Sequence, residues 1–398
     1  MNIIVQKFGG TSVRDGQTRR EAAKHVLTEV NNGKKVVVVV SAMGRKGDPY
    51  ATDTLLGLLS NQSALKNRDR DLFISCGEVI SAAIFTDLLL SMGLQAKAVT
   101  GAQAGIRTNE NFGNARIIDL KCQPLVNALH EHDVIVVAGF QGMTPAGEVA
   151  TLGRGGSDTS AVALAAALHA ERADIFTDVD GIMTADPTIV QDATTIHSVT
   201  YEEICNLAYQ GAKVIHPRAV EIAMQSNLPV KIRSTLSHEE GTLITGGFSL
   251  RERVITSIAY MPGITQITVR AKENLNVQTD VFKSMSAANI SVDFINIQPA
   301  SVVYTVPDER KEEAVRILKN KGYEPECLPG CAKVSAVGAG MAGVPGVASK
   351  IVEALTKDNI SIYQSADSHT TIWVLVKGED MKKAVLALHE AFQLGKSQ

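Results

Sequence analysis

The chain has 398 residues, of which 45% are hydrophobic and 20% charged, and its formal net charge is −3 at pH 7. This length predicts two or three domains of about 100–150 residues each, and the composition is typical of a soluble globular enzyme. The slightly acidic balance argues against nucleic acid or an anionic membrane surface as the main partner.

The sequence shows no targeting or membrane-spanning segment. No basic region followed by an apolar one stands at the N-terminus, and the longest apolar runs, 36–40 and 161–168, are far shorter than the roughly 20 residues that a membrane helix needs. The five cysteines are an odd number without a companion histidine cluster. This favours buried, reduced thiols in the cytoplasm and no metal ligands from protein side chains.

The first half of the chain alternates short apolar strands with helical segments. A helix is expected from about residue 18 to Gly33, and others cover 55–59, 72–92, the residues after 160 and those from Pro217. The predicted strands are 3–8, 36–40, 96–100, 134–138, 174–177 and 230–234. Such alternation indicates a parallel α/β sheet with both faces covered.

Glycine-containing turns follow these strands. Gly9 and Gly10 follow the first strand, Gly44 the second and Gly139 the fourth. Because ligands of parallel α/β sheets bind at the carboxyl ends of the strands, these turns are expected to meet at one site.

The segment 151–160 contains Gly153, Gly155 and Gly156 and leads into an alanine-rich run. Residues 157–160 (Ser, Asp, Thr, Ser) are all N-cap candidates for the helix that follows. A glycine-rich turn at a helix N-terminus offers N–H groups to an anion, and Arg154 adds a bidentate donor. The segment matches neither the dinucleotide fingerprint nor the P-loop, so an ordinary capped surface turn is the alternative.

Candidate residues for phosphoryl transfer surround this turn. Lys7, at the end of the first strand, suits nucleotide phosphates as a point charge, although a lone lysine there is more often solubilising. Lys213 is a second candidate for phosphate contact. An acceptor that is already a carboxylate needs no general base. If the acceptor is an amino acid, Arg154 suits its α-carboxylate and Glu78 suits its α-ammonium. A surface position on a helix is an equally expected alternative for Glu78.

The chain changes character after residue 243, where Gly246, Gly247 and the charged residues 251–253 suggest a linker. Beyond it the sequence repeats with a period of 70, so that 289–291 recurs as 359–361. Each repeat is expected to run strand, helix, strand, strand, helix, the order of a small ferredoxin-like module. Paired ligand sensors are the favoured interpretation, and a purely structural dimerisation domain is the alternative.

A set of motifs in this order resembles the aspartate kinases. The motifs are Lys7-Phe-Gly-Gly-Thr-Ser-Val13, Ser41-Ala-Met-Gly44, Ser75-Cys-Gly-Glu78, Gly139-Phe-Gln-Gly142, Gly153-Arg-Gly-Gly-Ser-Asp-Thr159, Thr177-Asp-Val-Asp-Gly181, Ala185-Asp-Pro187 and Gly211-Ala-Lys-Val-Ile-His-Pro-Arg218. The repeat is similar to that family's tandem ACT domains. Residues 41–53 and 365–373 look closest to the diaminopimelate-sensitive isozyme of spore-forming Gram-positive bacteria.

The resemblance implies an amino-acid-kinase (carbamate-kinase-like) fold, a three-layer α/β/α sandwich with a mainly parallel sheet, followed by tandem ferredoxin-like ACT domains. The expected bounds are 1–245 for the catalytic domain and 253–330 and 331–398 for the ACT units, with a strand near 253–261 completing the second. The implied reaction is phosphorylation of the side-chain carboxylate of L-aspartate by MgATP, the first step toward lysine, diaminopimelate, threonine and methionine.

The resemblance also implies roles for particular residues. Lys7 and Asp158 would be catalytic, and Mg²⁺ would be carried by the nucleotide. The aspartate contacts would be Thr52, Glu78, Arg154 and Ser157. The ATP contacts would be Lys7, Phe8, Gly9, Gly10, Ser41, Thr177, Asp178, Met183 and Lys213.

The effector site is expected on the first ACT unit, and a homo-oligomer is expected through the ACT domains. Asp293, Asn296 and Gln298 follow the first helix of this unit, and alternation along a strand predicts Asn296 and Gln298 on one face and Asp293 on the other. Meso-diaminopimelate is the favoured effector, with lysine or threonine possible. Residues 274–277 (Asn-Leu-Asn-Val) depart from the acidic residue and Pro-Gly that the family usually has there, which leaves the effector's identity open.

Two other functions fit the sequence less well. A relative that phosphorylates N-acetylglutamate, glutamate, carbamate or UMP is disfavoured by the ACT repeat and by the pairing of Arg154 with Glu78. A non-catalytic amino-acid-binding regulator is disfavoured because Lys7, Asp158 and Arg154 are all present.

Overall fold

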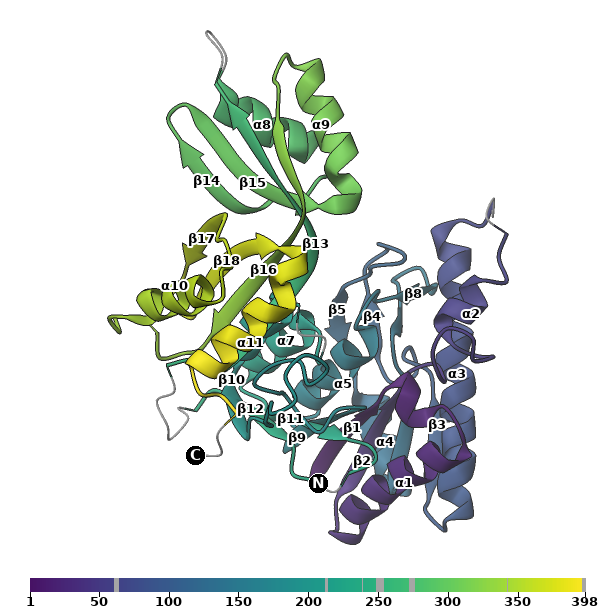
Figure 1. The fold of residues 1–398 in the computed structure, drawn as a ribbon. Helices are drawn as coiled ribbons and strands as arrows, with labels where there is room; N and C mark the ends of the chain where they lie inside the picture. Colours follow the sequence, from purple (N-terminus) through teal and green to yellow (C-terminus); the bar gives the residue numbers. More distant parts are fainter. Residues whose placement is uncertain are drawn as a thin grey trace. The chain divides into compact units, whose positions relative to one another are not determined.

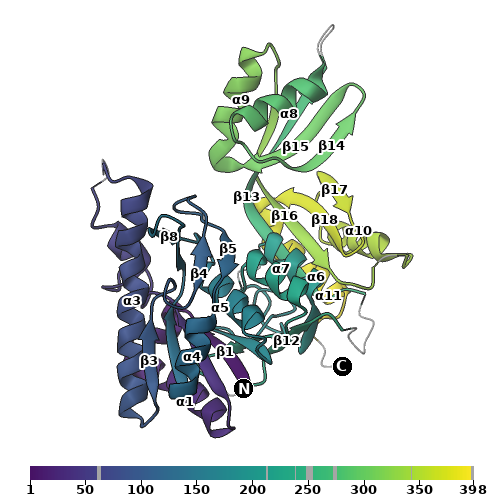
Figure 2. The same cartoon turned by 180° about the vertical axis from the view of Figure 1, so that it is seen from behind.

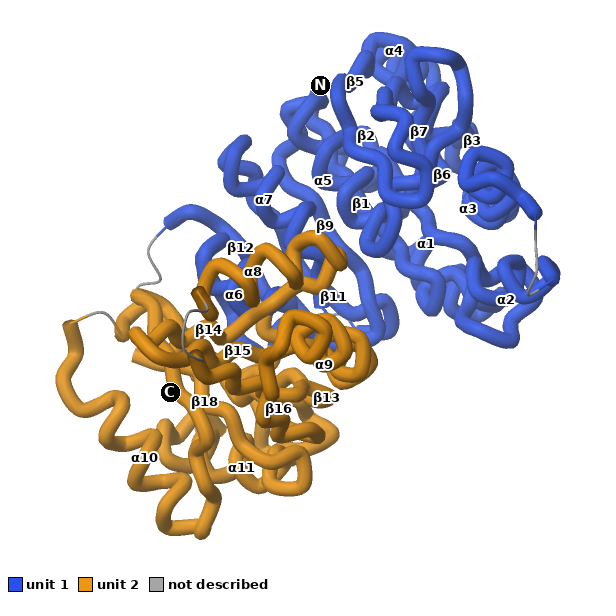
Figure 3. Tube along the Cα trace, turned by 90° about the horizontal axis from the view of Figure 1, so that it is seen from above, with its two compact units in different colours: residues 1–182, 195–209, 213–251 blue, residues 183–194, 210–212, 252–398 orange. Residues whose placement is uncertain are grey.

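The computed structural model describes residues 1–60, 64–211, 214–237, 239–247, 254–271, 276–341 and 343–395. The chain divides into two compact units, which Figure 3 colours separately. The first comprises residues 1–182, 195–209 and 213–251, and the second comprises residues 183–194, 210–212 and 252–398. The charged part of the expected linker, 251–253, lies outside the described residues.

An eight-stranded sheet forms the centre of the first unit (Figure 1). Its strand order is β10-β12-β11-β9-β1-β2-β6-β3, and only the β11–β12 pair is antiparallel. The strands are β1 (Ile3–Phe8), β2 (Lys35–Val40), β3 (Ala96–Val99), β6 (Val134–Ala138), β9 (Arg172–Thr177), β10 (Ser198–Thr200), β11 (Val230–Ser234) and β12 (Thr242–Thr245). The predicted, mainly parallel sheet is confirmed.

Helices cover both faces of this sheet. Side chains of α1 (Gly16–Asn31) and α3 (Asn67–Ser91) share one apolar cluster with alternate residues of β2 and β6. On the opposite face α5 (Gly156–Ala167) packs against β1, β2 and β9, as Figure 2 shows from behind. The β-branched run of β2 is fully buried, as a strand between two helical layers requires. The three layers form an α/β/α sandwich.

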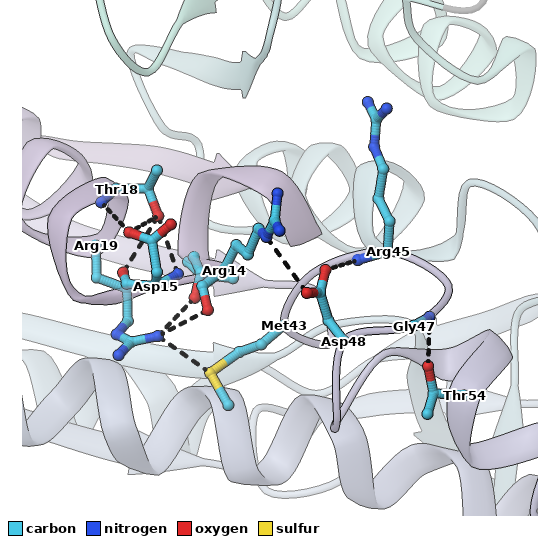
Figure 4. Close-up of polar contacts among 10 residues, drawn as sticks. Arg14, Asp15, Thr18, Arg19, Met43, Arg45, Gly47, Asp48 and Thr54 are labelled. Carbon is cyan, nitrogen blue, oxygen red and sulfur yellow. Dashed lines mark hydrogen bonds and ion pairs between the residues drawn. The ribbon is translucent and has the colours of Figure 1, made fainter.

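The first three helices of this unit begin earlier than the sequence predicts. At α1, Asp15 Oδ1 accepts hydrogen bonds from the N–H groups of Gln17 and Thr18, and Thr18 Oγ1 accepts one from the Asp15 N–H (Figure 4). This capping box starts α1 at Gly16. Helix α3 starts at Asn67 instead of near residue 72, and the short helix before it, α2, is Thr52–Leu56 rather than 55–59.

Helix α3 is long and apolar enough, by length and composition, to cross a membrane. Its buried residues include Asp71 and Glu78, whose carboxyl groups face the interior of the first unit, so it is a core helix of this unit. The five cysteines are free thiols, and Cys76 on α3 is exposed, so the expectation that the thiols are buried is wrong at this position.

The described part of the first unit also contains three further helices and a second, smaller sheet. Helices α4 (Gln123–Glu131), α6 (Tyr201–Tyr209) and α7 (Pro217–Ser226) complete its described helices, and α7 begins at the predicted proline. A second, four-stranded sheet has the order β5-β4-β7-β8. Its strands are β4 (Ile106–Thr108), β5 (Ile117–Leu120), β7 (Gln141–Met143) and β8 (Val149–Thr151).

The second unit is built on a six-stranded antiparallel sheet of order β14-β15-β13-β16-β18-β17. Its strands are β13 (Ser257–Arg270), β14 (Asp293–Gln298), β15 (Ser301–Pro307), β16 (Glu326–Val337), β17 (Gln364–Asp367) and β18 (Thr371–Lys377). The N-terminal half of β13 pairs with the part of β16 that also pairs with β18, and its C-terminal half pairs with β15. The long strands β13 and β16 therefore join the two repeats.

Each repeat has its own helices and core. Helices α8 (Val277–Ala287) and α9 (Lys311–Asn320) enclose one apolar cluster, and α10 (Val347–Lys357) and α11 (Met381–Ala391) enclose another. Tyr304 and Leu318 of the first core correspond to Val374 and Leu388 of the second, 70 residues later. The predicted repeat and its order of elements are confirmed.

Two segments from the middle of the chain belong to this second unit. The Thr184 carbonyl accepts a hydrogen bond from the Ile258 N–H (2.9 Å), and the Tyr260 hydroxyl donates to Asp186 (2.8 Å). The Met183 carbonyl accepts from Ser257 Oγ (3.0 Å). Met183, an expected ATP contact, is thus held by the second unit.

Candidate active site

Lys7 lies near the carboxyl end of β1 and pairs with the first turn of α5. Its Nζ atom is 2.7 Å from Asp158 Oδ1, and the two side chains are only 12% and 14% exposed. Salt screens such a buried pair much less than a surface pair. A purely solubilising role for Lys7 is therefore wrong, and the two residues expected to be catalytic lie together.

Two glycine-containing turns meet beside Lys7. The Gly44 N–H donates to the Gly10 carbonyl (2.8 Å), and the Ser41 N–H donates to the Phe8 carbonyl (3.1 Å). A Cβ atom on Gly10 would lie 2.5 Å from the Gly44 oxygen and 2.7 Å from the Ala42 oxygen. Only glycine permits this approach, so the turns after β1 and β2 form one surface.

Helix α5 begins at Gly156, and Gly155, in the left-handed region with φ +67°, is its N-cap. The expectation that one of residues 157–160 caps the helix is wrong, because all four lie inside its first turns. The reason is packing, since a Cβ on Gly155 would lie 2.3 Å from the His216 side chain. Among the described residues no side chain caps this N-terminus, and its N–H groups favour an anion.

Glu78 points into the interior of the first unit. It is 3% exposed, its Oε1 accepts the Ala42 N–H (3.0 Å), and its Oε2 has no hydrogen-bond partner among the described residues. Burial raises the pKa of this carboxyl from 4.5 to about 8, against the opposing effect of the Ala42 hydrogen bond. The alternative of a surface position is wrong, and Glu78 has an oxygen ready for a donor.

Hydrogen bonds and two ion pairs fasten the loop that follows β2 to its surroundings, and Figure 4 shows most of them. Asp48 accepts the Arg45 N–H (2.8 Å) and lies 3.3 Å from Arg14 Nε, while the Gly47 N–H donates to Thr54 Oγ1 (3.0 Å). The Arg45 guanidinium pairs with Asp178 after β9. The loop thus connects the turn that precedes α1, helix α2 and the carboxyl end of β9.

These elements enclose a cavity of about 900 Å³ within the first unit. The expected site residues that line it are Lys7, Gly10, Ser41, Thr52, Glu78, Arg154, Ser157 and Asp158. Basic and acidic groups therefore face one space, which is large enough for a drug-sized ligand. Among the described residues, no group of three or more His, Cys, Asp or Glu side chains is placed to hold a metal ion.

Four of the other residues expected to bind ATP lie beside this lining rather than in it. The Phe8 ring is fully buried and stacks on Phe176 at 4.7 Å, so only the Phe8 backbone is available to a nucleotide. Gly9 adjoins Lys7 Nζ, and Thr177 Oγ1 bonds to Asp178 (3.2 Å). Lys213 lies outside the described residues.

The cavity also has charged lining residues that the sequence analysis did not single out. They are Arg45, Lys46, Asp53, Arg70 and Asp71. Arg45 and Lys46 directly follow the turn after β2, so their position in the sequence was a usable signal. Asp71 stands seven residues before Glu78, a spacing that places both on one face of a helix.

Asp293, Asn296 and Gln298, the expected effector residues, lie on β14 of the second unit. Asp293 forms an ion pair with Lys333, which is 4% exposed, and Gln298 Oε1 accepts from Ser301 Oγ (3.2 Å). The three residues oppose Thr305, Val303 and Ser301, which are alternate residues of β15. All three side chains therefore share one face of the sheet.

The expectation that Asp293 faces the other way is wrong because β14 is irregular. Its register shifts between Asp293 and Asn296, and Phe294 has φ +55°. A bulge adds one residue to the strand and reverses the alternation beyond it. The shared face is the one away from the α8–α9 core, since Val302 and Tyr304 of β15 belong to that core.

Comparison with known sequences places the chain in a family. Residues 2–234 match the profile of the amino acid kinase family, and residues 326–390 match that of an ACT domain. Aspartokinase 1 of Bacillus subtilis (strain 168) is 59% identical over 404 residues, with both chains covered completely. An aspartokinase of Geobacillus stearothermophilus is 41% identical over 405 residues, covering 99% of this chain and 98% of the relative.

Solved structures of aspartokinases match the fold of this chain. E. coli aspartokinase III in complex with aspartate and ADP (R-state) matches with a TM-score of 0.81 at 28% identity, covering 98% of this chain and 99% of that one. The same enzyme in complex with lysine and aspartate (T-state) gives a TM-score of 0.77 at 29% identity, with the same coverage.

The fold, the charged cavity and these relatives define the class of protein. The chain belongs to the amino acid kinase family, and within it to the aspartokinases. It is an aspartate kinase, which phosphorylates aspartate and is regulated through ACT domains.

Proposed function

We propose that the cavity of the first unit binds ATP and L-aspartate side by side and that Lys7 and Asp158 catalyse the transfer. One observation supports this most strongly. The buried Lys7–Asp158 pair shares a single cavity with Arg154 and with the unpartnered oxygen of Glu78. A phosphoryl donor and an α-amino-acid acceptor are the ligands that match these charges.

Arg154 and Glu78 would hold the two charged groups of the substrate head. The Arg154 side chain is exposed to the cavity and suits the α-carboxylate as a bidentate donor. Glu78 Oε2 would accept a hydrogen bond from the α-ammonium, whose charge favours the ionised carboxylate. Thr52 and Ser157 would lie near the side-chain carboxylate, which is the group that reacts.

The N–H groups of the two joined turns and of α5 would hold the nucleotide phosphates. Gly9, Gly10 and Ser41, together with the Phe8 backbone, would surround them, and Thr177, Asp178, Met183 and Lys213 would contact the rest of ATP. Mg²⁺, carried by the phosphates, would neutralise part of their charge. Protein residues would complete that neutralisation, with Lys7 closest to the transferred group.

The chemistry needs little beyond position and charge. The aspartate side chain is ionised at neutral pH, so its oxygen can attack the γ-phosphorus while the bond to ADP breaks, and no proton has to be removed. Lys7 would stabilise the charge on the transferred group, and Asp158 would hold the Lys7 ammonium in place. The product would be 4-phospho-L-aspartate and ADP.

We further propose the biological setting. Residues 1–245 would form the catalytic domain, and 253–330 and 331–398 the ACT units, through which the chain would form a homo-oligomer in the cytoplasm. The enzyme would open the route to lysine, diaminopimelate, threonine and methionine. Meso-diaminopimelate is the favoured effector, because its two amino-acid ends suit the carboxylate and amides that β14 presents on one face.

Trapping of the acyl phosphate with hydroxylamine tests the assignment of the head group. L-aspartate should give hydroxamate with MgATP, whereas succinate, which has no ammonium, and N-acetyl-L-aspartate, whose nitrogen is uncharged, should give far less. Equal yields from all three acceptors would remove Glu78 from its proposed role.

A further inference from the structure

A buried carboxylate outside the proposed substrate contacts ties the two halves of the aspartate site together. Asp71 lies on α3 and is 1% exposed. Its Oδ2 accepts the N–H groups of Gly113 (2.8 Å) and Thr151 (2.7 Å), and its Oδ1 accepts Thr151 Oγ1 (2.9 Å). In the described part of the chain, no Lys, Arg or His forms an ion pair with it.

The partners of Asp71 lead directly to Arg154. Thr151 is the last residue of β8, three residues before Arg154, and its carbonyl accepts the Ala115 N–H (2.8 Å). Gly153 packs so closely on the neighbouring loop that a Cβ there would lie 3.0 Å from the Gly113 carbonyl oxygen. The loop and the strand end are therefore packed and hydrogen-bonded to each other, and Asp71 fastens both to α3.

A second polar residue holds the same piece from the other side. Arg218, in the first turn of α7, donates to the Leu152 carbonyl (3.2 Å) and to Asn114 Oδ1 (2.8 Å). The backbone just before Arg154 is thus fixed between α3 and α7. Of these two helices, α3 is the one that also carries a proposed substrate contact, Glu78.

Asp71 and Glu78 are seven residues apart on the buried face of α3. Two turns of one helix therefore join Asp71, which holds the end of β8 just before Arg154, to Glu78, which is proposed to bind the ammonium. Asp71 therefore links the segment that carries Arg154, the proposed carboxylate contact, to the helix that carries Glu78, the proposed ammonium contact.

We propose that Asp71 is a positioning residue that sets the separation between Arg154 and Glu78 and thereby the stereochemical selectivity for L-aspartate. The inference rests on the proposed roles of those two residues. A chiral amino acid is distinguished from its mirror image when three of its groups are held at fixed points. Here the points are Arg154, Glu78 and the site of phosphoryl transfer beside Lys7. If Arg154 is held less firmly relative to Glu78, the discrimination between L- and D-aspartate weakens.

Three variants test whether Asp71 positions Arg154 relative to Glu78. Asp71→Ala leaves two N–H groups and a hydroxyl without their acceptor, so we expect the KM for L-aspartate to rise about 30-fold and the preference for L- over D-aspartate to fall about tenfold. The KM for ATP should change less than about twofold. In Asp71→Asn the amide oxygen can accept both N–H groups while its NH₂ donates to Thr151 Oγ1, so near-normal values should return. Asp87→Ala, which removes an exposed carboxylate from the same helix, is the matched control.

The outcomes separate the possibilities. A general loss of folding would lower the yield of active enzyme but leave the L/D preference of the folded fraction unchanged, and that result would overturn the inference. An Asp71→Asn variant as impaired as Asp71→Ala would also overturn it, because the charge rather than the hydrogen bonds would then matter. If Asp71→Ala does not fold, Asp71→Asn and Thr151→Val, which removes only the hydroxyl, still report the L/D preference. If Thr151→Val then left the preference at the wild-type value, the inference would fail.

The proposed function can fail separately. Should Arg154→Ala leave aspartate binding intact, the assignment of Arg154 would be wrong whatever Asp71 does. Should Arg154→Ala lose aspartate while Asp71→Ala keeps both its KM and its L/D preference, only the positioning role would be wrong.

Discussion

The cavity of the first unit and the open face of β14 in the second differ in how they hold their polar groups. In the cavity, Lys7, Asp158 and Glu78 are largely buried, and helices or strands fix each of them. On β14, Asp293, Asn296 and Gln298 are exposed, and an edge strand with a bulge carries them. Buried charges in fixed positions suit catalysis, whereas exposed groups on an edge suit a ligand that comes and goes.

This comparison predicts two separable classes of variant. Changes in the cavity should alter turnover in the absence of any effector. Changes on β14 should alter the response to an effector and leave basal turnover unchanged.

Lys7→Ala should have the largest effect. Removing the cation nearest the transferred phosphoryl group should lower kcat by about 10³-fold, the size of effect seen when one preorganised donor is lost. The KM for ATP should change much less, because the charge matters most during transfer. Steady-state kinetics measure both, with the exposed Lys24→Ala as control. A normal kcat with only a raised KM for ATP would show that Lys7 binds the nucleotide without assisting the reaction.

Arg154→Ala should come next. Loss of a bidentate partner for the α-carboxylate should raise the KM for aspartate about 100-fold, since such charge-assisted hydrogen bonds contribute about 1.5–3 kcal/mol. Calorimetry should find the affinity for ATP nearly intact. The exposed Arg116→Ala, elsewhere in the same unit, is the matched control. An equal fall in ATP affinity would assign Arg154 to the nucleotide instead.

Glu78→Gln should raise the KM for aspartate at least about tenfold, because an amide cannot pair with the ammonium. The pKa of about 8 adds a second test. In the free enzyme at pH 7 the carboxyl is mostly protonated, and the arriving ammonium favours ionisation, so binding should release a proton. Calorimetry in two buffers of different ionisation enthalpy measures that proton. Wild type and the exposed control Glu110→Gln should release it and Glu78→Gln should not.

The raised pKa of Glu78 also predicts how stability depends on pH. The carboxyl ionises above about pH 4.5 in the unfolded chain and above about pH 8 in the folded one. Between these values the unfolded chain binds fewer protons, so the free energy of unfolding falls as the pH rises through this window. Glu78→Gln has no carboxyl to ionise and so does not lose this free energy. The free energy of unfolding of Glu78→Gln, minus that of wild type, should therefore be more positive at pH 9 than at pH 5. Equal differences in denaturant unfolding at both pH values would contradict the buried carboxyl.

Local patterns were enough to predict the framework of the molecule. The β-branched run of β2, the glycines after β1 and β2 and the 70-residue repeat are properties of neighbouring or regularly spaced residues, and each is found in the structure. Lys7, Glu78, Arg154 and Asp158 were also expected at one site, because they stand in the motifs that resemble those of the aspartate kinases, and all four line the cavity.

Contacts between residues far apart in the sequence were not predictable in this way. The N-cap of α5 depends on His216, which packs against Gly155. Asp71 finds its partners 42 and 80 residues away, so nothing near it in the chain marks its role. The bulge in β14 depends on its pairing with β15, and it reversed the face expected for Asp293. Each of these three misses concerns a position that tertiary packing decides.

Gln298→Ala should give the smallest effect and the sharpest test of the second class. It removes an exposed amide from the face that also presents Asp293 and Asn296, so inhibition should require about fivefold more effector, the consequence of losing about 1 kcal/mol from one hydrogen-bonding group. Uninhibited kcat should not change. Ser368→Ala, at the corresponding position 70 residues later in the other repeat, is the matched control and should be inhibited like wild type.

Titrations with meso-diaminopimelate, lysine and threonine, alone and in pairs, would decide between the outcomes. Equal inhibition of wild type and Gln298→Ala would remove Gln298 from the site. A shift in Ser368→Ala instead would place the effector on the second repeat, where no carboxylate or amide stands at the positions of Asn296 and Gln298, which are Ala366 and Ser368. No inhibition of the wild type by any of the three would contradict the effectors proposed for β14. A lowered basal kcat in Gln298→Ala would break the separation itself, because an exposed edge-strand group would then contribute to catalysis as well as to control.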